Sequence, residues 1–123
     1  MSNCNVLLVE NSKTARVVMT KLLEAKGYSV TAVGNGLGAI EGAKTGQFDV
    51  IVMDLYMPQM NGYEAAKKIR MLDGEGAQVP MIALTASTDT KDKQICEDAG
   101  MNHFVLKSEN NAELFDVLQQ YNR

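Results

Sequence analysis

Asp54 is the residue of this sequence best placed to do chemistry. It directly follows an apolar run at residues 50–53 and precedes a loop that contains Pro58 and Gly62. A carboxylate between a buried strand and such a loop is held at a rigid rim that solvent can reach, and open α/β sheets place their ligand sites at that rim. Three further polar positions also follow apolar runs: Glu10–Asn11, Thr85 and Lys107.

Five short aliphatic runs predict the strands that position these side chains. They lie at residues 6–9, 28–33, 50–53, 81–84 and 104–106. Three of the runs are apolar without alternation, as expected for strands that are buried on both faces of a parallel sheet. Helices should therefore cover both faces of the sheet.

The segments between and after the runs predict five helices. The first, at residues 12–26, carries apolar residues at helical spacing and stops at Gly27, which tolerates positive φ. These apolar residues are Val17, Val18, Leu22 and Ala25. The third and fifth helices open with capping-box signals, Asn61 with Glu64 and Asn110 with Glu113.

The second and fourth helices have weaker signals. The second, near residues 37–44, contains Gly38 and Gly42, which each cost about 1 kcal/mol relative to alanine, so it should be short and mobile. The fourth, near residues 90–99, is mostly charged and should be weakly anchored. Its only residues to bury are Ile95, Cys96 and Ala99.

Five strand and helix pairs in this order predict a flavodoxin-like (βα)5 fold of the α/β class. Right-handed crossovers favour a doubly wound, five-stranded parallel sheet with strand order 2-1-3-4-5. In this order the carboxyl ends of strands one, three, four and five are neighbours. Glu10, Asn11, Asp54, Thr85 and Lys107 should therefore converge, although they lie up to 97 positions apart.

Size and composition exclude several classes of protein. The 123 residues, of which 46% are hydrophobic, suit a single domain over residues 1–123. A net charge of -3 and dispersed basic residues argue against direct nucleic-acid binding. Cys4 and Cys96 are isolated thiols that offer no metal or redox motif. No segment approaches the roughly 20 apolar residues of a membrane span, and we expect a cytoplasmic protein without membrane insertion.

At its polar rim the chain resembles the receiver domain of two-component response regulators and hybrid histidine kinases. The resemblance extends from the first strand to the fifth helix. The segment DLYMPQMNGYE, at residues 54–64, is close to the phosphoacceptor signature of that family. Thr85-Ala86-Ser87 and Lys107 resemble the switch hydroxyl segment and the active-site lysine of the family.

The resemblance implies a phosphorelay function. Asp54 would take a phosphoryl group from the phosphohistidine of a histidine kinase or a histidine phosphotransfer protein. Magnesium and Lys107 would supply positive charge to the charge-rich transition state. The ligands of Mg²⁺ would be Glu10, Asn11, Asp54, the backbone carbonyl of Tyr56 and waters. Such a domain is a signalling module that catalyses at most its own phosphorylation and dephosphorylation.

Further residues would carry the switch and its lifetime. Thr85 would donate a hydrogen bond to the phosphoryl oxygen, and Phe104 would rotate inward and reshape the surface around the fourth helix. Tyr56 and Ser87 stand where the family tunes the attack of water on the aspartyl phosphate. The output would pass to a downstream protein or effector domain, and a homodimer that depends on phosphorylation is a further expectation.

Two residues depart from the family pattern. Receivers usually carry two acidic residues after the first strand, whereas this chain has Glu10 and then Asn11. An amide in place of a carboxylate should weaken magnesium binding by about tenfold or more, because charges about 4 Å apart interact by ~4 kcal/mol at an effective dielectric of 20. Ser108 replaces the usual proline after Lys107, and a cis bond before a non-proline residue costs about 3 to 4 kcal/mol. The bond from Lys107 to Ser108 should therefore be trans.

Simpler structural roles remain open for the same residues. Asp54 could be a surface acid at a strand end, and Asn11 could cap the first helix. Thr85 could only begin a loop, Lys107 could be solvated, and Phe104 is a core aromatic with or without a switching role.

Other functions compete with the phosphorylatable receiver. The main alternative is a pseudo-receiver, a protein-interaction module with impaired magnesium and phosphoryl binding, which Asn11 and Ser108 favour. A phosphatase of the haloacid dehalogenase type would need a second aspartate at the position of Tyr56. A flavin-binding protein would need a phosphate loop after the first strand, where Glu10 opposes an anion.

Overall fold

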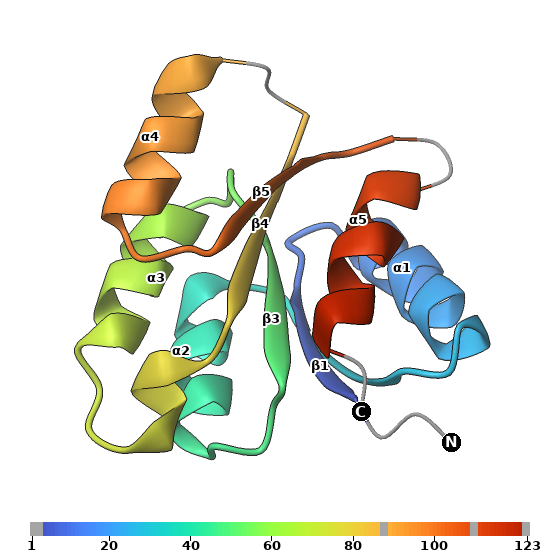
Figure 1. Cartoon of the computed structure of the whole chain (residues 1–123), viewed down its shortest axis with the longest axis horizontal. Coiled ribbons are helices and arrows are strands. Elements are labelled where there is room, and N and C mark those ends of the chain that lie inside the picture. The colour runs from blue at the N-terminus through green and yellow to red at the C-terminus, as the bar shows by residue number, and fades with distance from the viewer. Residues whose placement is uncertain (1–3, 87–88, 109–110, 122–123) are drawn as a thin grey trace.

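The protein alternates five strands with five α-helices (Figure 1). The computed structural model describes residues 4–86, 89–108 and 111–121. The strands are β1 (Asn5–Val9), β2 (Ser29–Val33), β3 (Val50–Asp54), β4 (Met81–Thr85) and β5 (His103–Leu106). The helices are α1 (Lys13–Ala25), α2 (Gly36–Lys44), α3 (Gly62–Arg70), α4 (Thr90–Asp98) and α5 (Ala112–Leu118), with short 3-10 helices η1 (Glu75–Gln78) and η2 (Gln119–Tyr121).

The sheet has the predicted topology. All neighbouring strands are parallel, and their order is β2-β1-β3-β4-β5. Val9 of β1 pairs with Met53 of β3, and Asp54 pairs with Leu84 of β4. The register therefore brings the carboxyl ends of β1, β3 and β4 to one edge of the sheet.

Two hydrophobic cores lie on opposite faces of the sheet. Helices α2, α3 and α4 cover one face, and α1 and α5 cover the other (Figure 1). Every residue of β3 and β4 is buried, because helices pack on both of their faces. This confirms the interpretation of the unalternating apolar runs.

Helix α1 forms where predicted but buries a different face. The apolar side chains that indicated the helix lie outside: Val17, Val18 and Leu22 are 46%, 52% and 39% exposed, and Ala25 is also exposed. Leu23 is the buried residue of the helix, and Met19 packs partly against the same core. The apolar stripe is wider than the strip that the sheet covers, so part of it remains on the surface.

Helix α4 corrects one finer prediction, and α5 makes a contact with β5 that was not predicted. Ile95 of α4 is 37% exposed, and only Cys96 within the helix is buried, since a single row of α4 faces the core. Helix α5 begins after Asn111, and Asn110 lies outside the described residues. The predicted capping box of Asn110 with Glu113 therefore stays a prediction; the Glu113 carboxylate accepts a hydrogen bond from the Leu106 N–H at 3.0 Å, which ties α5 to β5.

The capping box predicted at the start of α3 is confirmed, and Gly42 of α2 has a packing role that was not predicted. The Asn61 N–H donates to the Glu64 carboxylate at 3.0 Å, as a capping box requires. Gly42 lies over β1, where a β-carbon would come within 2.6 Å of the Leu7 side chain. Glycine at this position lets α2 approach the sheet closely.

Candidate functional site

Three charged side chains from distant parts of the chain meet at the carboxyl edge of the sheet. Glu10 follows β1, Asp54 ends β3 and Lys107 follows β5. The Lys107 Nζ atom lies 3.4 Å from Glu10 Oε1 and 3.4 Å from Asp54 Oδ1. The predicted convergence across 97 positions is therefore confirmed for these three residues.

Both carboxylates of this triad are buried, whereas the lysine is exposed. Glu10 is 7% and Asp54 is 8% exposed. The Glu10 N–H donates to the Val33 carbonyl at 3.0 Å, and its Oε2 atom accepts from the Ser12 N–H at 3.0 Å. These bonds fix Glu10 on the rim beside Asp54.

Burial and charge give Asp54 an unusual proton affinity. Burial, followed by the negative charge of Glu10, raises the pKa of Asp54 from 3.8 to about 6, while Lys107 opposes the rise. Two acidic groups and a single ammonium leave this pocket deficient in positive charge. A further cation would favour the ionised form of Asp54, which is the nucleophilic form.

This pKa predicts an unusual pH dependence of stability. Between pH 4 and pH 6 the unfolded chain releases a proton that folded Asp54 retains, so folding becomes less favourable as the pH rises through this interval. The difference between the pKa values of 3.8 and about 6 corresponds to at most about 3 kcal/mol. Without metal, Asp54→Asn should therefore stabilise the protein by about 1 to 3 kcal/mol at pH 7 and much less at pH 4.

Urea unfolding of the wild type and Asp54→Asn at both pH values, with EDTA present, measures this difference. Asp116→Asn, at an exposed aspartate of α5, is the matched control. A stabilisation that is equal at both pH values would contradict the raised pKa of Asp54.

Asn11 lies at the margin of the triad. Its side chain is exposed and donates a long hydrogen bond of 3.4 Å to the Gly34 carbonyl. It does not cap α1, because the cap is Ser12, whose hydroxyl accepts from the Ala15 N–H at 3.3 Å. Asn11 as a metal ligand stays a prediction.

Thr85 and Phe104 lie on adjacent strands, but Thr85 ends β4 opposite Leu106, whereas Phe104 pairs with Ala83 further from the edge. Thr85 is 1% exposed, and its carbonyl accepts a hydrogen bond from the Lys107 N–H at 2.7 Å. Phe104 is half-buried and packs against the core beneath α2, α3 and α4. Their switching roles stay predictions, and Ser87 lies outside the described residues.

The segment that carries Lys107 has a trans backbone, as predicted. The described residues contain no cis peptide bond, so the bond from Lys107 to Ser108 is trans. The Ser108 hydroxyl accepts a hydrogen bond from the Asn111 N–H at 3.1 Å, directly before α5. Ser108, where the family usually has proline, thus contacts the residue that precedes α5.

Gly62, at the start of α3, packs against the backbone of Asp54, a contact that was not predicted from the sequence. Its N–H donates to the Leu55 carbonyl at 2.8 Å. A β-carbon on Gly62 would lie 2.6 Å from the Asp54 carbonyl oxygen. The close approach of α3 to the end of β3 therefore requires glycine.

The donor set fits magnesium better than a transition metal. Within the residues that the structure describes, no cluster of three or more His, Cys, Asp and Glu side chains could hold a metal ion. Mg²⁺ needs only one or two carboxylates and keeps several waters. Glu10, Asp54 and the Tyr56 carbonyl are oxygen donors of this kind.

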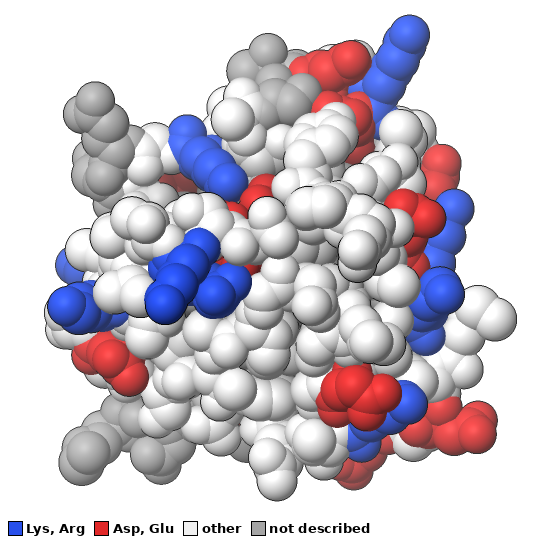
Figure 2. All heavy atoms as spheres, turned by 180° about the vertical axis from the view of Figure 1, so that it is seen from behind, with Lys and Arg blue, Asp and Glu red and all other residues white. Residues whose placement is uncertain are grey.

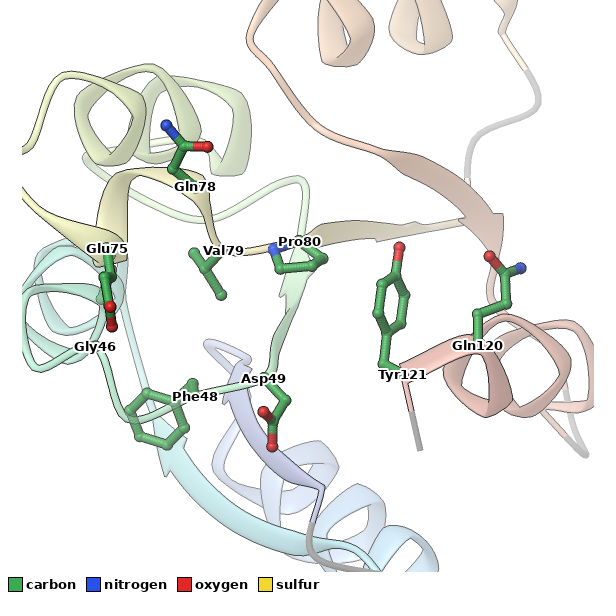
Figure 3. Close-up of a pocket in the computed structure, with 11 residues that line it drawn as sticks. Gly46, Phe48, Asp49, Glu75, Gln78, Val79, Pro80, Gln120 and Tyr121 are labelled. Atoms are coloured by element: carbon green, nitrogen blue, oxygen red, sulfur yellow. The ribbon is translucent and has the colours of Figure 1, made fainter. Parts of the chain in front are cut away.

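A hollow lies at the end of the sheet opposite the charged triad (Figure 3). It has a volume of about 480 Å³, and Phe48 and Tyr121 lie on opposite sides of it. None of the predicted site residues lines it. The hollow is therefore separate from the charged triad.

Charges of both signs are mixed on the face seen in Figure 2, mostly towards its margins. No broad basic area covers this face. The prediction of no direct nucleic-acid binding is compatible with this distribution and stays a prediction. No helix within the described part of the chain is long and apolar enough to span a membrane.

The family of the chain follows from comparison with known proteins. The family model for the response regulator receiver domain matches residues 6–119. The chain belongs to the response regulator receiver domain family. It is therefore a signalling domain of two-component phosphorelay systems, as the resemblance at residues 54–64 indicated.

The curated relatives of this receiver domain include hybrid histidine kinases. Over 83% of its length it is 38% identical to hybrid signal transduction histidine kinase B of Dictyostelium discoideum. Over 98% of its length it is 30% identical to probable histidine kinase 1 of Oryza sativa subsp. indica. The chain spans only 6% and 16% of these two proteins.

Solved receiver domains have the same fold. The magnesium-bound receiver domain of the sensor histidine kinase PA1611 from Pseudomonas aeruginosa is 37% identical, with a TM-score of 0.86 and 97% coverage of both chains. The Ssk1 receiver domain of Saccharomyces cerevisiae, solved with the phosphotransfer protein Ypd1, is 29% identical, with a TM-score of 0.87 and coverage of 98% of this chain and 89% of that chain.

Proposed function

We propose that this receiver domain accepts a phosphoryl group on Asp54 from the phosphohistidine of a histidine kinase or a histidine phosphotransfer protein. The observation that carries the proposal is the triad, in which Lys107 Nζ lies 3.4 Å from both Glu10 and Asp54. One buried carboxylate is thereby held beside a cation at an accessible rim, as a phosphoryl acceptor requires.

In the transfer, an Asp54 carboxylate oxygen attacks phosphorus and the bond to the histidine nitrogen breaks. The histidine regains its electron pair, and charge spreads over the phosphoryl oxygens. Lys107 can neutralise part of this charge, because it already contacts the acceptor carboxylate. Bound Mg²⁺, held by Glu10, Asp54, the Tyr56 carbonyl and Asn11, would supply further positive charge.

The phosphoryl group would then change the conformation of the domain. The Thr85 hydroxyl would donate to a phosphoryl oxygen, and Phe104 would turn further into the core that it already contacts. Tyr56 and Ser87 would set the rate of hydrolysis. The domain would catalyse only these reactions of its own aspartate, and its cytoplasmic location stays a prediction.

The exposed apolar face of α1 suits the donor protein. Val18 and Leu22 line a hollow of about 230 Å³ that Glu10 and Lys107 also line, so this face adjoins the phosphorylation site. A donor that presents phosphohistidine to Asp54 must contact the surface around the triad. The Ssk1 receiver was solved with such a phosphotransfer protein. The phosphorylated domain would then pass the signal to a downstream protein or effector domain, or would form a homodimer.

Intact-mass spectrometry after incubation with acetyl phosphate tests phosphorylation. The wild type should gain one phosphoryl group in a magnesium-dependent reaction, and Asp54→Ala should gain none, because the nucleophile is absent. Asp98→Ala removes an exposed carboxylate of α4 and should behave as the wild type. Absence of an adduct on the wild type, together with no response to beryllofluoride, would support the pseudo-receiver.

Magnesium affinity tests the departure at Asn11. Asn11→Asp should tighten Mg²⁺ binding by about tenfold or more, because a second charged ligand would join Glu10. Titration of Mg²⁺ into the wild type and Asn11→Asp by isothermal calorimetry measures the change. Equal affinities would show that position 11 does not bind the metal.

A further inference from the structure

The guanidinium of Arg16 holds the backbone that follows β1. Arg16 lies near the start of α1, its side chain is half-buried, and side chains of a helix tilt towards the helix N-terminus. Its Nη1 atom donates to the Glu10 carbonyl at 2.9 Å and to the Asn11 carbonyl at 3.2 Å. One cation thus binds two successive carbonyls, and both belong to residues that we propose as magnesium ligands.

The bond from Arg16 to Asn11 fixes the orientation of the next peptide group. In a trans peptide the C=O and N–H groups point in opposite directions, and the described residues contain no cis peptide bond. Because the Asn11 carbonyl points towards Arg16, the Ser12 N–H points away from it. This N–H donates to the Glu10 Oε2 atom at 3.0 Å. Arg16 therefore sets the direction of the donor that holds the Glu10 carboxylate.

Gly34 leaves room for the guanidinium on the side of the loop that faces β2. A β-carbon on Gly34 would lie 2.6 Å from the Arg16 Nη1 atom. The Gly34 carbonyl accepts the bond from the Asn11 side chain, and the Val33 carbonyl accepts from the Glu10 N–H. The backbone of Glu10 and Asn11 is therefore held from two sides, by the end of β2 and by Arg16.

We propose that Arg16 is a positioning residue for the magnesium site, which holds the Glu10 carboxylate in the orientation that binds the ion. This inference rests on the magnesium site of the proposed function. Loss of a group that orients a metal ligand typically lowers metal affinity by about 10- to 100-fold. Arg16 is itself a cation, so its charge alone would repel Mg²⁺. The positioning effect and the charge effect of Arg16 on Mg²⁺ affinity therefore have opposite signs.

Isothermal calorimetry with Mg²⁺ tests this role of Arg16. Arg16→Met loses both hydrogen bonds and should bind Mg²⁺ about tenfold more weakly than the wild type. Arg16→Lys keeps the charge but not the planar group, so its affinity should lie between these two. Lys13→Met removes an exposed cation of the same helix and should not weaken binding. Equal or tighter binding by Arg16→Met, or no binding of Mg²⁺ to the wild type, would overturn the inference.

Gly34→Ala is a second variant, in which the arginine is still present. Gly34 does not have a positive φ, and the three atoms nearest to the new β-carbon all belong to the flexible Arg16 side chain. The guanidinium should therefore move while the fold persists, and Mg²⁺ affinity should fall towards that of Arg16→Met. The double variant should bind no more weakly than Arg16→Met, because both changes act through the same group. Multiplication of the two effects would overturn the inference.

Phosphoryl uptake from acetyl phosphate separates this inference from the proposed function. Arg16→Met retains Asp54 and Lys107, so its initial rate should be reduced at limiting Mg²⁺ and should approach that of the wild type at saturating Mg²⁺. A deficit that persists at saturating Mg²⁺ would overturn a role confined to the metal site. If Arg16→Met binds Mg²⁺ more weakly than the wild type but neither protein gains a phosphoryl group, the proposed phosphorylation fails, whereas the positioning role of Arg16 stands.

Discussion

Replacement of Arg70 by methionine is expected to lower the free energy of unfolding by about 3 kcal/mol. The guanidinium at the end of α3 makes five hydrogen bonds to four acceptors. These are the carbonyls of Gly100, Ala77 and Val79 and the Asn102 side chain, at 2.7 to 3.0 Å. Methionine keeps most of the volume but leaves these acceptors without their donors.

The bonds of Arg70 connect three separate segments. Arg70 lies on α3, Ala77 on η1, and Gly100 in the turn between α4 and β5. Burial lowers the pKa of Arg70, because the charged guanidinium loses contact with water in the folded protein. The several bonds to one planar group offset this loss. Arg70→Lys should also destabilise the protein, because a single ammonium cannot reach all the acceptors.

Urea unfolding followed by circular dichroism measures the effect at Arg70. Lys68→Met, at an exposed cation of the same helix, is the matched control and should change the free energy of unfolding by less than about 0.5 kcal/mol. Equal effects of Arg70→Met and Lys68→Met would contradict the structural role of the guanidinium.

Gly62→Ala is expected to destabilise the protein by about 1 to 3 kcal/mol and to disturb the proposed phosphorylation site. The new β-carbon would lie 2.6 Å from the Asp54 carbonyl oxygen and 3.1 Å from the Leu55 α-carbon. Both are backbone atoms, which cannot rotate away. Either α3 or the end of β3 must therefore shift, although alanine favours a helix more than glycine does.

Gly42→Ala is the matched control for Gly62→Ala. Its β-carbon would also come within 2.6 Å of a neighbour, but that neighbour is the end of the Leu7 side chain, which can rotate. Its destabilisation should be smaller by at least about 1 kcal/mol. Urea unfolding and the rate of phosphoryl uptake from acetyl phosphate should both separate the two variants. Normal uptake by Gly62→Ala would show that the backbone of Asp54 tolerates the shift.

The sequence was sufficient for the strands, the sheet order and the charged residues of the site. Unalternating apolar runs occur where both faces of a strand are covered, so β3 and β4 could be placed to within one residue. The residue after each run then had to lie at the carboxyl edge. This is why Glu10, Asp54 and Lys107 could be grouped in advance.

The sequence was insufficient where a local pattern allows more than one packing arrangement. The apolar stripe of α1 indicated a helix but not which part of the stripe the sheet would cover, and Val17 and Val18 remained exposed. The capping pattern of Glu113 did not indicate its hydrogen bond to Leu106 of β5. Both outcomes depend on neighbours that are distant in sequence.

By itself, the sequence determined the fold, the family signature and the residue types of the site, because periodicity and short motifs act locally. Only the tertiary structure decided the raised pKa of Asp54, the contact of Gly62 with the backbone of Asp54 and the bonds of Arg70. Each of these depends on distances between atoms of different elements. Such distances are set by how the helices pack on the sheet. This packing involves several segments at once, so no single segment of the sequence predicts it.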